Sequence, residues 1–219
     1  MSGLSPEIKD QLKEFGTCAV SDALDRLGIP GGLHGIRPIV QGVSMCGPAF
    51  TVHYVPCGEN KGTVGDFLDD VHPGEVVVID NAGRVYCTVW GGLMSVSASL
   101  RKLEGTIIDG VCRDVSVIYK ENYPIFTKGT YMVTGKDRVE VDAINTKVAV
   151  SGTQVKPGDI ILADDTGALV IPLERLDEVF FIAKEIADKE NQIMGQIVQG
   201  KTLRDARSSV AYHQLQTRK

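Results

Sequence analysis

The sequence predicts a single α/β domain arranged as a sandwich, and three observations lead to this fold class. A strand, a helix and a second strand follow one another in residues 84–112, as in a crossover between parallel strands. Many further apolar runs are short and strand-like, whereas few segments have helical periodicity. Two segments, HPGEVVVID (72–80) and KPGDIILAD (156–164), share a Pro-Gly turn, a buried strand and a terminal Asp.

Length and composition agree with one folded unit. The 219 residues are 43% hydrophobic, which is enough to bury a large core without disulfides. No Pro/Ser-rich linker divides the chain. We therefore expect a helical segment at 1–16, one α/β domain at 17–200 and a C-terminal tail at 201–219. The five cysteines have no C-x-x-C spacing, which indicates reduced thiols.

The charge balance and the hydropathy pattern argue against several partners. A net charge of −5 and a pI near 5.4 disfavour nucleic acid, because a phosphate-binding face needs clustered Lys and Arg. The first residues lack the apolar core of a signal peptide. No apolar run approaches the roughly 20 residues that span a bilayer. The expectation is a soluble, cytoplasmic protein that binds neither nucleic acid nor membrane.

The first elements are predicted from caps and alternation. Ser5 begins a helix over residues 5–15, and a second helix starts with a cap at Thr17 or Ser21. A Gly/Pro-rich loop follows. It leads to a strand within residues 44–56, where apolar side chains alternate with others.

A helix introduced by Gly91 and Gly92 and closed by Gly105 is expected in the middle of the chain. Its apolar residues lie roughly along one face at Leu93, Val96, Leu100 and Leu103. Beyond it, short strands are expected in YPIFTKG, KVAVSGTQV and ALVIP. A long amphipathic helix is expected over residues 174–198.

Familiar site motifs are missing from the sequence. There is no phosphate-binding loop, no dinucleotide fingerprint and no G-x-S-x-G elbow. The four histidines lack metal-ligand spacing, which argues against zinc chemistry. One feature that remains is the Gly91-Gly92 pair, which opens a helix directly after a strand. Free N–H groups at a helix start attract an anion such as a carboxylate, although a tight turn is the alternative interpretation.

The other remaining feature is Arg113-Asp114, at the end of the strand that follows this helix. Ligand sites in open α/β sheets collect at such strand ends. Arg can hold a carboxylate through two hydrogen bonds, and Asp can hold a hard cation such as Mg²⁺. Together they suit a 2-oxo acid, while a structural ion pair is the alternative. Asp80 and Asp109 also lie near strand ends and are interpreted as turn or cap residues.

The ordered motifs WGGLMSVSA, IDGVCRD, YPIFTKG and VKPGDIILADDTGALVIP resemble the RraA-like family, from about Thr17 to Gly200. This family includes class II pyruvate aldolases that act on 4-hydroxy-4-methyl-2-oxoglutarate and 4-carboxy-4-hydroxy-2-oxoadipate. The resemblance implies a β/β/α swivelling-domain-like sandwich. It also implies assembly as homotrimers or hexamers, with active sites at subunit interfaces.

The resemblance further implies a catalytic apparatus. Arg113 would hold pyruvate and stabilise the enolate oxygen, and Asp114 would anchor Mg²⁺ or Mn²⁺. The substrate carboxylate would be bound at the helix start by Gly91, Gly92, Leu93 and Met94. The implied reaction is metal-dependent cleavage of a 4-hydroxy-2-oxo acid to release pyruvate, with oxaloacetate decarboxylation through the same enolate.

Two positions depart from the pattern of the family's aldolases. Val117 and Gly92 stand where acids are usual, which matters more for aldol cleavage than for decarboxylation of oxaloacetate. Glu190, in the long helix, could project into a neighbour's site but is interpreted as a solvated helix acid. The alternative function is an RraA-type regulator that binds a ribonuclease without catalysis. The retained Arg-Asp pair favours the enzyme.

Overall fold

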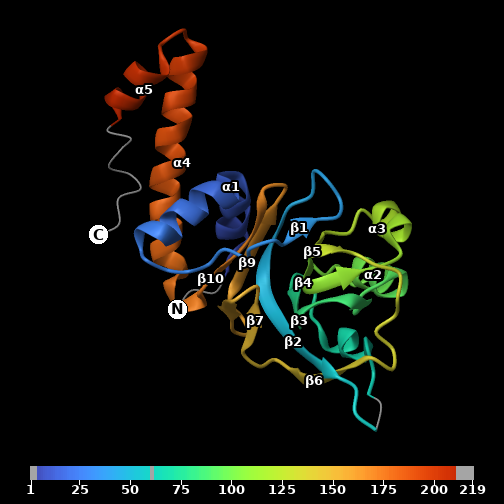
Figure 1. The fold of residues 1–219 in the computed structure, drawn as a ribbon. Helices are drawn as coiled ribbons and strands as arrows, with labels where there is room; N and C mark the ends of the chain where they lie inside the picture. Colours follow the sequence, from blue (N-terminus) through green and yellow to red (C-terminus); the bar gives the residue numbers. More distant parts are fainter. Residues whose placement is uncertain (1–3, 60–61, 211–219) are drawn as a thin grey trace.

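A mixed β-sheet organises the molecule in the computed structural model, which describes residues 4–59 and 62–210 (Figure 1). The strand order is β1-β5-β4-β3-β2-β9-β10, with β6 paired to β2, while β7 and β8 form a separate hairpin. The strands are β1 (Arg37–Pro38), β2 (Met45–Pro56), β3 (Val76–Thr88), β4 (Gly105–Cys112), β5 (Ile125–Thr130), β6 (Val139–Ile144), β7 (Val148–Val150), β8 (Thr153–Val155), β9 (Ile160–Asp164) and β10 (Gly167–Ile171).

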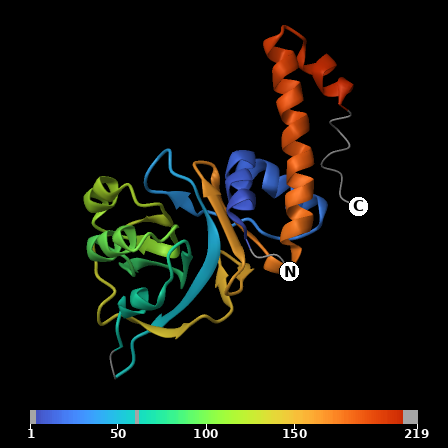
Figure 2. The same ribbon diagram turned by 180° about the vertical axis from the view of Figure 1, so that it is seen from behind.

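Helices cover the sheet from two sides, as Figures 1 and 2 show. Helices α2 and α3 lie beside β3, β4 and β5, whereas α1 and α4 lie beyond β9 and β10. The helices are α1 (Pro6–Arg26), α2 (Gly92–Leu100), α3 (Val115–Glu121), α4 (Leu176–Val198) and α5 (Leu203–Ser209), with 3-10 turns η1 (Asp66–Asp70) and η2 (Leu173–Arg175). The predicted α/β sandwich is confirmed.

Strands β2 to β5 run parallel, and their crossovers decide where polar residues collect. Helix α2 joins β3 to β4, and α3 joins β4 to β5. Because the strands are parallel, the carboxyl ends of β3 and β4 lie at one edge of the sheet, where both helices begin. Thr88 at the end of β3 pairs with Val111 near the end of β4. The predicted strand–helix–strand unit is confirmed.

Strand β9 is buried on both faces, as its continuous apolar run predicts. Ile160 and Leu162 pack with α1 and α4, whereas Ile161 and Ala163 belong to the core on the other face of the sheet. All four are at most 1% exposed. The period-two alternation of a strand thus divides one apolar run between two cores.

Element α1 consists of two helices that meet at a kink at Gly16, so the predicted second start is confirmed, but one of the two predicted caps is wrong. Ser5 accepts a hydrogen bond from Ile8 N–H, as expected. The backbone leaves helical geometry at Gly16, which has φ 77°. The second half begins at Thr17, whose N–H and hydroxyl both donate to Asp164 at 2.8 Å. The cap is therefore a carboxylate from the end of β9, so the prediction of a cap at Thr17 or Ser21 is wrong.

Helix α2 buries small residues instead of its leucines. Its buried positions are Gly92, Ser95 and Ala98. Leu93 is 91% exposed and Leu100 is 78% exposed, so the predicted apolar face is wrong at both positions. Small residues on the inner side let the helix lie close to the sheet. The leucines consequently project outward.

The predicted closure of this helix at Gly105 is also wrong. The helix ends at Leu100, and Lys102 takes the left-handed conformation with φ 59°. Gly105 instead begins β4. A Cβ there would lie 2.3 Å from Met45 Sδ and 2.8 Å from Pro124 O, so close packing requires the glycine.

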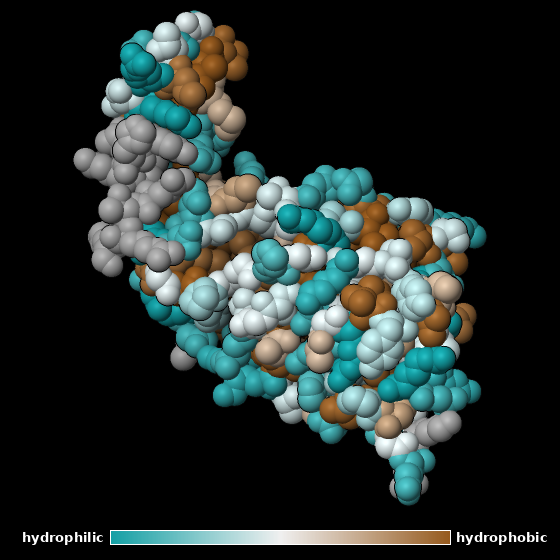
Figure 3. Space-filling model, viewed as in Figure 1, coloured by the Kyte–Doolittle hydropathy of each residue, from teal (hydrophilic) through white to brown (hydrophobic). Residues whose placement is uncertain are grey.

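The C-terminal helices form an arm that extends from the body (Figures 1 and 3). The predicted long helix is confirmed as α4. Within the segment expected as a tail, Thr202 accepts from Asp205 N–H and begins α5, while residues 211–219 lie outside the described part. None of the described helices is both long and apolar enough to cross a bilayer. All five cysteines are free thiols.

Candidate functional site

A cavity of about 420 Å³ opens at the sheet edge where α2 and α3 begin. Its lining comes from residues 88–94, the Arg113-Asp114 pair, residues 62–66, and Thr134 and Lys136. The six residues predicted from the sequence therefore line one cavity: Gly91, Gly92, Leu93, Met94, Arg113 and Asp114. Its volume lies in the range typical of small-molecule sites.

Gly91 allows two charged side chains to approach the backbone. Its conformation is extended, with φ −155° and ψ −166°, so no left-handed turn explains the glycine. A Cβ at this position would lie 2.8 Å from Asp114 Oδ2 and 3.2 Å from Arg113 Nε. Close approach, and not a tight turn, is the physical reason for glycine here.

The start of α2 holds the Asp114 carboxylate. Gly92 N–H donates to Asp114 Oδ2 at 2.9 Å, so the carboxylate lies at the positive end of the helix dipole. The next two N–H groups, of Leu93 and Met94, have no acceptor in a preceding turn of α2. Both residues line the cavity. Of the three predicted amide groups, one is thus used by Asp114 and two are available to an anion.

Arg113 and Asp114 do not form a buried ion pair. Arg113 Nε lies 3.7 Å from Asp114 Oδ2, and the two side chains are 40% and 47% exposed. Arg113 N–H donates to Trp90 O at 3.0 Å, which fixes the end of β4 against the end of β3. The structural-pair alternative does not fit two half-exposed groups beside a cavity.

Trp90, which the sequence analysis did not single out, forms a rigid wall of the cavity. Its indole N–H donates to Ser95 Oγ, which in turn donates to Gly91 O. Its ring stacks on Tyr123 with centroids 6.1 Å apart and planes 2° from parallel. These contacts hold the backbone that leads into α2.

Two further charged residues of the lining, Asp66 and Lys136, were also missed. Each follows a glycine that packs tightly against the site. A Cβ on Gly65 would lie 3.2 Å from Met94 Sδ, and a Cβ on Gly135 would lie 2.4 Å from Thr88 O. A glycine followed by a charged residue outside the predicted helices and strands is the sequence signal that could have found both.

The two positions that depart from the aldolase pattern are neighbours in space. A Cβ on Gly92 would lie 3.2 Å from Val117 Cγ2. The valine side chain thus fills the space beside the glycine, and neither position supplies a carboxylate. The acids that line the cavity are Asp114 and Asp66, which come from different elements.

The other two acids near strand ends accept backbone hydrogen bonds. The interpretation as a turn residue is confirmed for Asp80, whereas Asp109 binds residues that are distant in the sequence. Asp80 accepts hydrogen bonds from Ala82 and Ala149 N–H groups. Asp109 accepts one from Ser151 N–H and lies 2.5 Å from Lys128 Nζ.

Glu190 lies on α4, which is on the other side of the sheet from α2 and α3 (Figure 2). Burial raises the pKa of its carboxyl, with a further contribution from the charge of Asp22. It does not line the cavity of its own chain.

The donor set fits a hard divalent cation bound through Asp114. Within the described residues, no three His, Cys, Asp or Glu side chains gather as a metal site. Mg²⁺ does not need such a cage, since it keeps several waters and binds proteins through one or two carboxylates. Gly92 N–H orients Oδ2 of Asp114, and the half-exposed carboxylate is accessible from the cavity.

Comparisons with known proteins agree with this fold. The RraA-like family model, described as aldolase/RraA, matches residues 17–170. The chain is 42% identical over 217 residues to protein DlpA of Legionella pneumophila, which covers 97% of this chain but only 35% of DlpA. It is 30% identical over 185 residues to a candidate 4-hydroxy-4-methyl-2-oxoglutarate aldolase of Halalkalibacterium halodurans, covering 84% of this chain and 86% of that protein.

A solved structure leads to the same family. The crystal structure of an uncharacterized protein from Pseudomonas syringae pv. tomato superposes with a TM-score of 0.88 at 36% identity, covering 94% of this chain and 100% of that one. The family model, for its part, spans more than half of the sequence. The chain therefore belongs to the RraA-like family, which comprises aldolases and RraA proteins.

Proposed function

We propose that this protein is a divalent-metal-dependent lyase that releases pyruvate from a 4-hydroxy-2-oxo acid and also decarboxylates oxaloacetate. The observation that carries the proposal is one cavity that collects a guanidinium, a half-exposed carboxylate and the start of a helix. The aldolase name of the relative from Halalkalibacterium halodurans supports the same reaction class.

The substrate carboxylate is bound by Arg113 and by the start of α2. Arg113 can donate two parallel hydrogen bonds to a carboxylate. The N–H groups of Leu93 and Met94, with the helix dipole behind them, add donors at the same wall of the cavity. The C1 carboxylate is therefore fixed, and the C2 carbonyl is placed beside it.

Asp114 holds Mg²⁺ or Mn²⁺ in this proposal. Gly92 N–H donates to Oδ2 of Asp114 and keeps the carboxylate oriented. When bound, the cation supplies Lewis-acid stabilisation of negative charge on the substrate oxygens. The guanidinium of Arg113, 3.7 Å from Asp114 Oδ2, adds fixed positive charge at the same place.

The C3–C4 bond breaks, and its electron pair becomes the enolate of pyruvate, which then takes a proton from water at C3. The other product is carbon dioxide from oxaloacetate, or a carbonyl compound whose new C=O is formed at C4 from a 4-hydroxy-2-oxo acid. From a 4-hydroxy-2-oxo acid, the C4 hydroxyl also loses its proton, and Asp66 is the carboxylate on the lining that can accept it. From oxaloacetate, carbon dioxide leaves and no such base is needed. Decarboxylation is thus the less demanding reaction for this cavity.

Assembly into homotrimers or hexamers, with the site at a subunit interface, is part of the proposal. Leu93, which lines the cavity, and Leu100 on the same helix are 91% and 78% exposed, and a second subunit would cover both. Apolar side chains are also exposed near the tip of the α4–α5 arm, for example Val198 at 87% (Figure 3). Light scattering would give the mass in solution. The free thiols suit the cytoplasm, where we expect the protein to act.

The test of the function is release of pyruvate. Protein dialysed against a chelator is assayed with oxaloacetate and with a panel of 4-hydroxy-2-oxo acids, before and after Mg²⁺ or Mn²⁺ is restored. We expect turnover only with the metal, and its loss in Arg113→Ala. Turnover that persists in Arg113→Ala would remove the proposed role of the guanidinium.

The second candidate is a ribonuclease-binding regulator. The missing acids at Gly92 and Val117 favour it, because a regulator needs no proton transfer at this cavity. A pull-down with a ribonuclease, together with no turnover on any acid of the panel, would support this function over the lyase.

A further inference from the structure

We infer that Trp90 and Ser95 position the carboxylate of Asp114 for its cation, through a chain of hydrogen bonds that crosses the first turn of α2. The inference rests on the proposed function, since it concerns the residue that holds the metal there. Neither side chain is a ligand of the cation or a donor to the substrate in that proposal. Both are therefore positioning residues, which act through Asp114.

The chain consists of three consecutive hydrogen bonds. The indole N–H of Trp90 donates to Ser95 Oγ at 3.0 Å, and the Ser95 hydroxyl donates to Gly91 O at 3.0 Å. Gly92 N–H then donates to Asp114 Oδ2 at 2.9 Å. Because an indole nitrogen can only donate and a carbonyl oxygen can only accept, the proton of the Ser95 hydroxyl lies toward Gly91 O. The direction of each bond is therefore fixed.

The second and third bonds meet in one peptide unit. The carbonyl of Gly91 and the N–H of Gly92 belong to the same planar group, so a bond that fixes the first also fixes the direction of the second. Gly91 O accepts from both the N–H and the hydroxyl of Ser95, each at 3.0 Å. Glycine on both sides gives this peptide wide conformational freedom, which the two bonds remove. Ser95 thus holds the peptide whose N–H orients Asp114.

Trp90 also holds the backbone next to Asp114. Its carbonyl oxygen accepts from Arg113 N–H at 3.0 Å. Asp114 itself has a left-handed backbone conformation with φ 58°, which a residue with a side chain adopts only at a cost in free energy. Contacts from outside α3 must therefore maintain this conformation. Trp90 supplies one of them directly, through Arg113, and acts on the carboxylate through the chain.

Burial makes the chain rigid. Trp90 is 2% exposed and Ser95 is 0% exposed, so water does not compete for their bonds. The indole ring is stacked on Tyr123, whose hydroxyl lies 3.1 Å from Thr106 Oγ1. Hydrogen bonds in series also polarise one another in a buried environment. The chain thus connects a fixed ring in the core to the half-exposed carboxylate of Asp114 at the cavity.

The alternative interpretation is that these bonds only stabilise the fold. Their loss would then lower the stability of the protein but leave the cation affinity of the folded protein unchanged. Positioning predicts a loss of affinity, because a carboxylate that can rotate loses more conformational entropy when it binds the cation. The two interpretations therefore differ in a quantity that can be measured without turnover.

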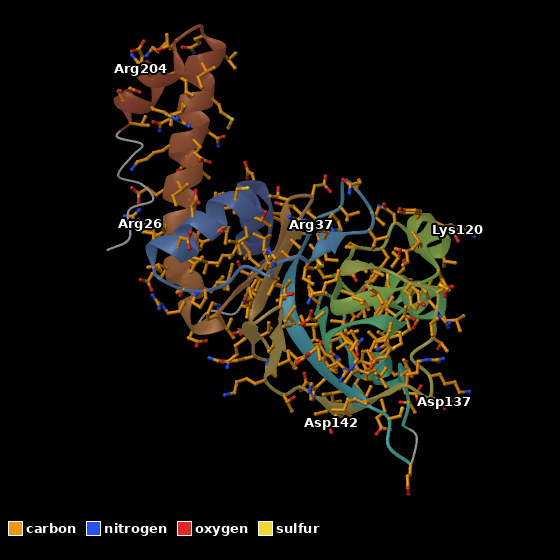
Figure 4. The ribbon with its side chains drawn as sticks, in the orientation of Figure 1. Arg26, Arg37, Lys120, Asp137, Asp142 and Arg204 are labelled. Carbon is orange, nitrogen blue, oxygen red and sulfur yellow. The ribbon has the colours of Figure 1, made fainter. Side chains whose placement is uncertain are left out.

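The full chain is titrated with Mn²⁺, and the free ion is measured by electron paramagnetic resonance. The variants are Ser95→Ala, Trp90→Phe and the double variant. The matched control is Ser97→Ala, which makes the same change on the same helix outside the cavity lining. Two further variants locate the ion: Asp114→Asn removes the proposed ligand, and Asp142→Asn removes an exposed acid on β6 outside the lining (Figure 4).

We expect Ser95→Ala and Trp90→Phe each to weaken Mn²⁺ binding about tenfold, the lower end of the effects of residues that lie behind a metal ligand. The double variant should bind no more weakly than the single ones, because each change breaks the same chain. Ser97→Ala and Asp142→Asn should bind Mn²⁺ as the wild type does. Asp114→Asn should lose the site.

Urea unfolding of the same variants measures the structural contribution separately. Ser95→Ala leaves the buried indole N–H of Trp90 without a partner and should lower the stability. In a Trp90→Phe background the same change should cost less stability, since no indole N–H remains. Mn²⁺ affinity, in contrast, should stay low in the double variant. An affinity that recovers together with the stability would contradict the inference.

Other outcomes also overturn the inference. They are wild-type Mn²⁺ affinity in Ser95→Ala and Trp90→Phe, losses that multiply in the double variant, binding that persists in Asp114→Asn, and a wild-type protein that binds no Mn²⁺. The proposed function fails separately. If no acid of the panel releases pyruvate, yet both single variants weaken Mn²⁺ binding, the positioning role stands and the lyase does not. Metal-dependent release of pyruvate with unchanged Mn²⁺ affinity in both variants would support the lyase and overturn the positioning role.

Discussion

Two carboxylates in this protein hold the start of a helix from the end of a strand, but they differ in how fully they are bonded. Asp164, at the end of β9, accepts from Thr17 N–H, Thr17 Oγ1 and Thr166 N–H, each at 2.8 Å. Asp114, after β4, accepts one bond from Gly92 N–H and is 47% exposed. In both places a glycine precedes the residue whose N–H is bound: Gly16 precedes Thr17, and Gly91 precedes Gly92.

The difference separates an acid whose oxygens are hydrogen-bonded within the protein from one that can still accept a ligand. Burial acts to raise the pKa of Asp164, but the hydrogen bonds from Thr17 and Thr166 outweigh it, so the pKa is lowered. Its acceptor positions are used by the protein itself. Asp114 has acceptor capacity left and lies beside a cavity. The same local arrangement therefore serves stability in one region, and in the proposed function it serves ligand binding in the other.

The largest effect is expected at Asp114, the carboxylate that can still accept a ligand. Asp114→Asn should lower pyruvate release by about 100-fold or more, equivalent to about 2.7 kcal/mol, because the metal loses its anionic ligand. The free energy of unfolding should change by less than about 1 kcal/mol, since Asn can still accept from Gly92 N–H. Urea unfolding and the pyruvate assay check the two parts. A fully active Asp114→Asn protein would contradict the proposed role of Asp114 as a metal ligand.

The next largest effect is expected at Asp164, whose oxygens are hydrogen-bonded within the protein. Its replacement should lower stability and leave activity unchanged. Asp164→Ala removes the acceptor of three donors and should lower the free energy of unfolding by about 2 kcal/mol. Pyruvate release at a temperature where the variant is folded should be unchanged. Unchanged stability in urea would show that these hydrogen bonds contribute nothing net.

A methyl group at Gly91 should disturb the site without unfolding the protein. Its Cβ would lie 2.8 Å from Asp114 Oδ2, so the carboxylate must shift, and we expect about a tenfold loss of turnover in Gly91→Ala. The matched control is Gly195→Ala in α4, where a Cβ meets no atom within 4 Å. The control should keep full activity and gain about 0.5–1 kcal/mol of stability. Equal activity of both variants would contradict the close-approach explanation.

The smallest effect concerns acid pH. The pKa of Asp164 is lower in the folded protein than the usual value of an aspartate, so its contribution to stability is fully present above that usual value and is lost as pH falls through the folded pKa. The stability difference between wild type and Asp164→Asn should therefore be constant near neutral pH and shrink below about pH 4. Urea unfolding from pH 7 to pH 2.5 measures it. A difference that grows with acidification has the wrong sign for this explanation.

The parts of the fold that depend on near neighbours could be predicted from the sequence. The cap at Ser5 needs only the next three residues, and the burial of β9 needs only its uninterrupted apolar run. The placement of Arg113 and Asp114 at a strand end likewise follows from the apolar run before them. Their meeting with the Gly91-Gly92 pair follows from the handed crossover that joins β3 to β4.

Features that depend on distant residues could not be predicted in this way. Thr17 is capped by a residue 147 positions away, so no local pattern could identify its partner. Leu93 and Leu100 have helical spacing, yet α2 is buried on the side that carries its small residues. The leucines on the other side are therefore exposed. Asp66 and Lys136 reach the cavity because two glycines let their loops pack closely.

The sequence by itself determined the α/β class, the strand–helix–strand unit and the position of the Arg-Asp pair at a strand end, because these depend on residue type and short-range periodicity. Only the tertiary structure decided that the Asp164 oxygens are fully hydrogen-bonded whereas Asp114 can still accept a ligand. It also decided that Asp66 and Lys136 line the cavity. Hydrogen-bond donors and close contacts come from elements that are far apart along the chain, so their number at each acid is known only after folding.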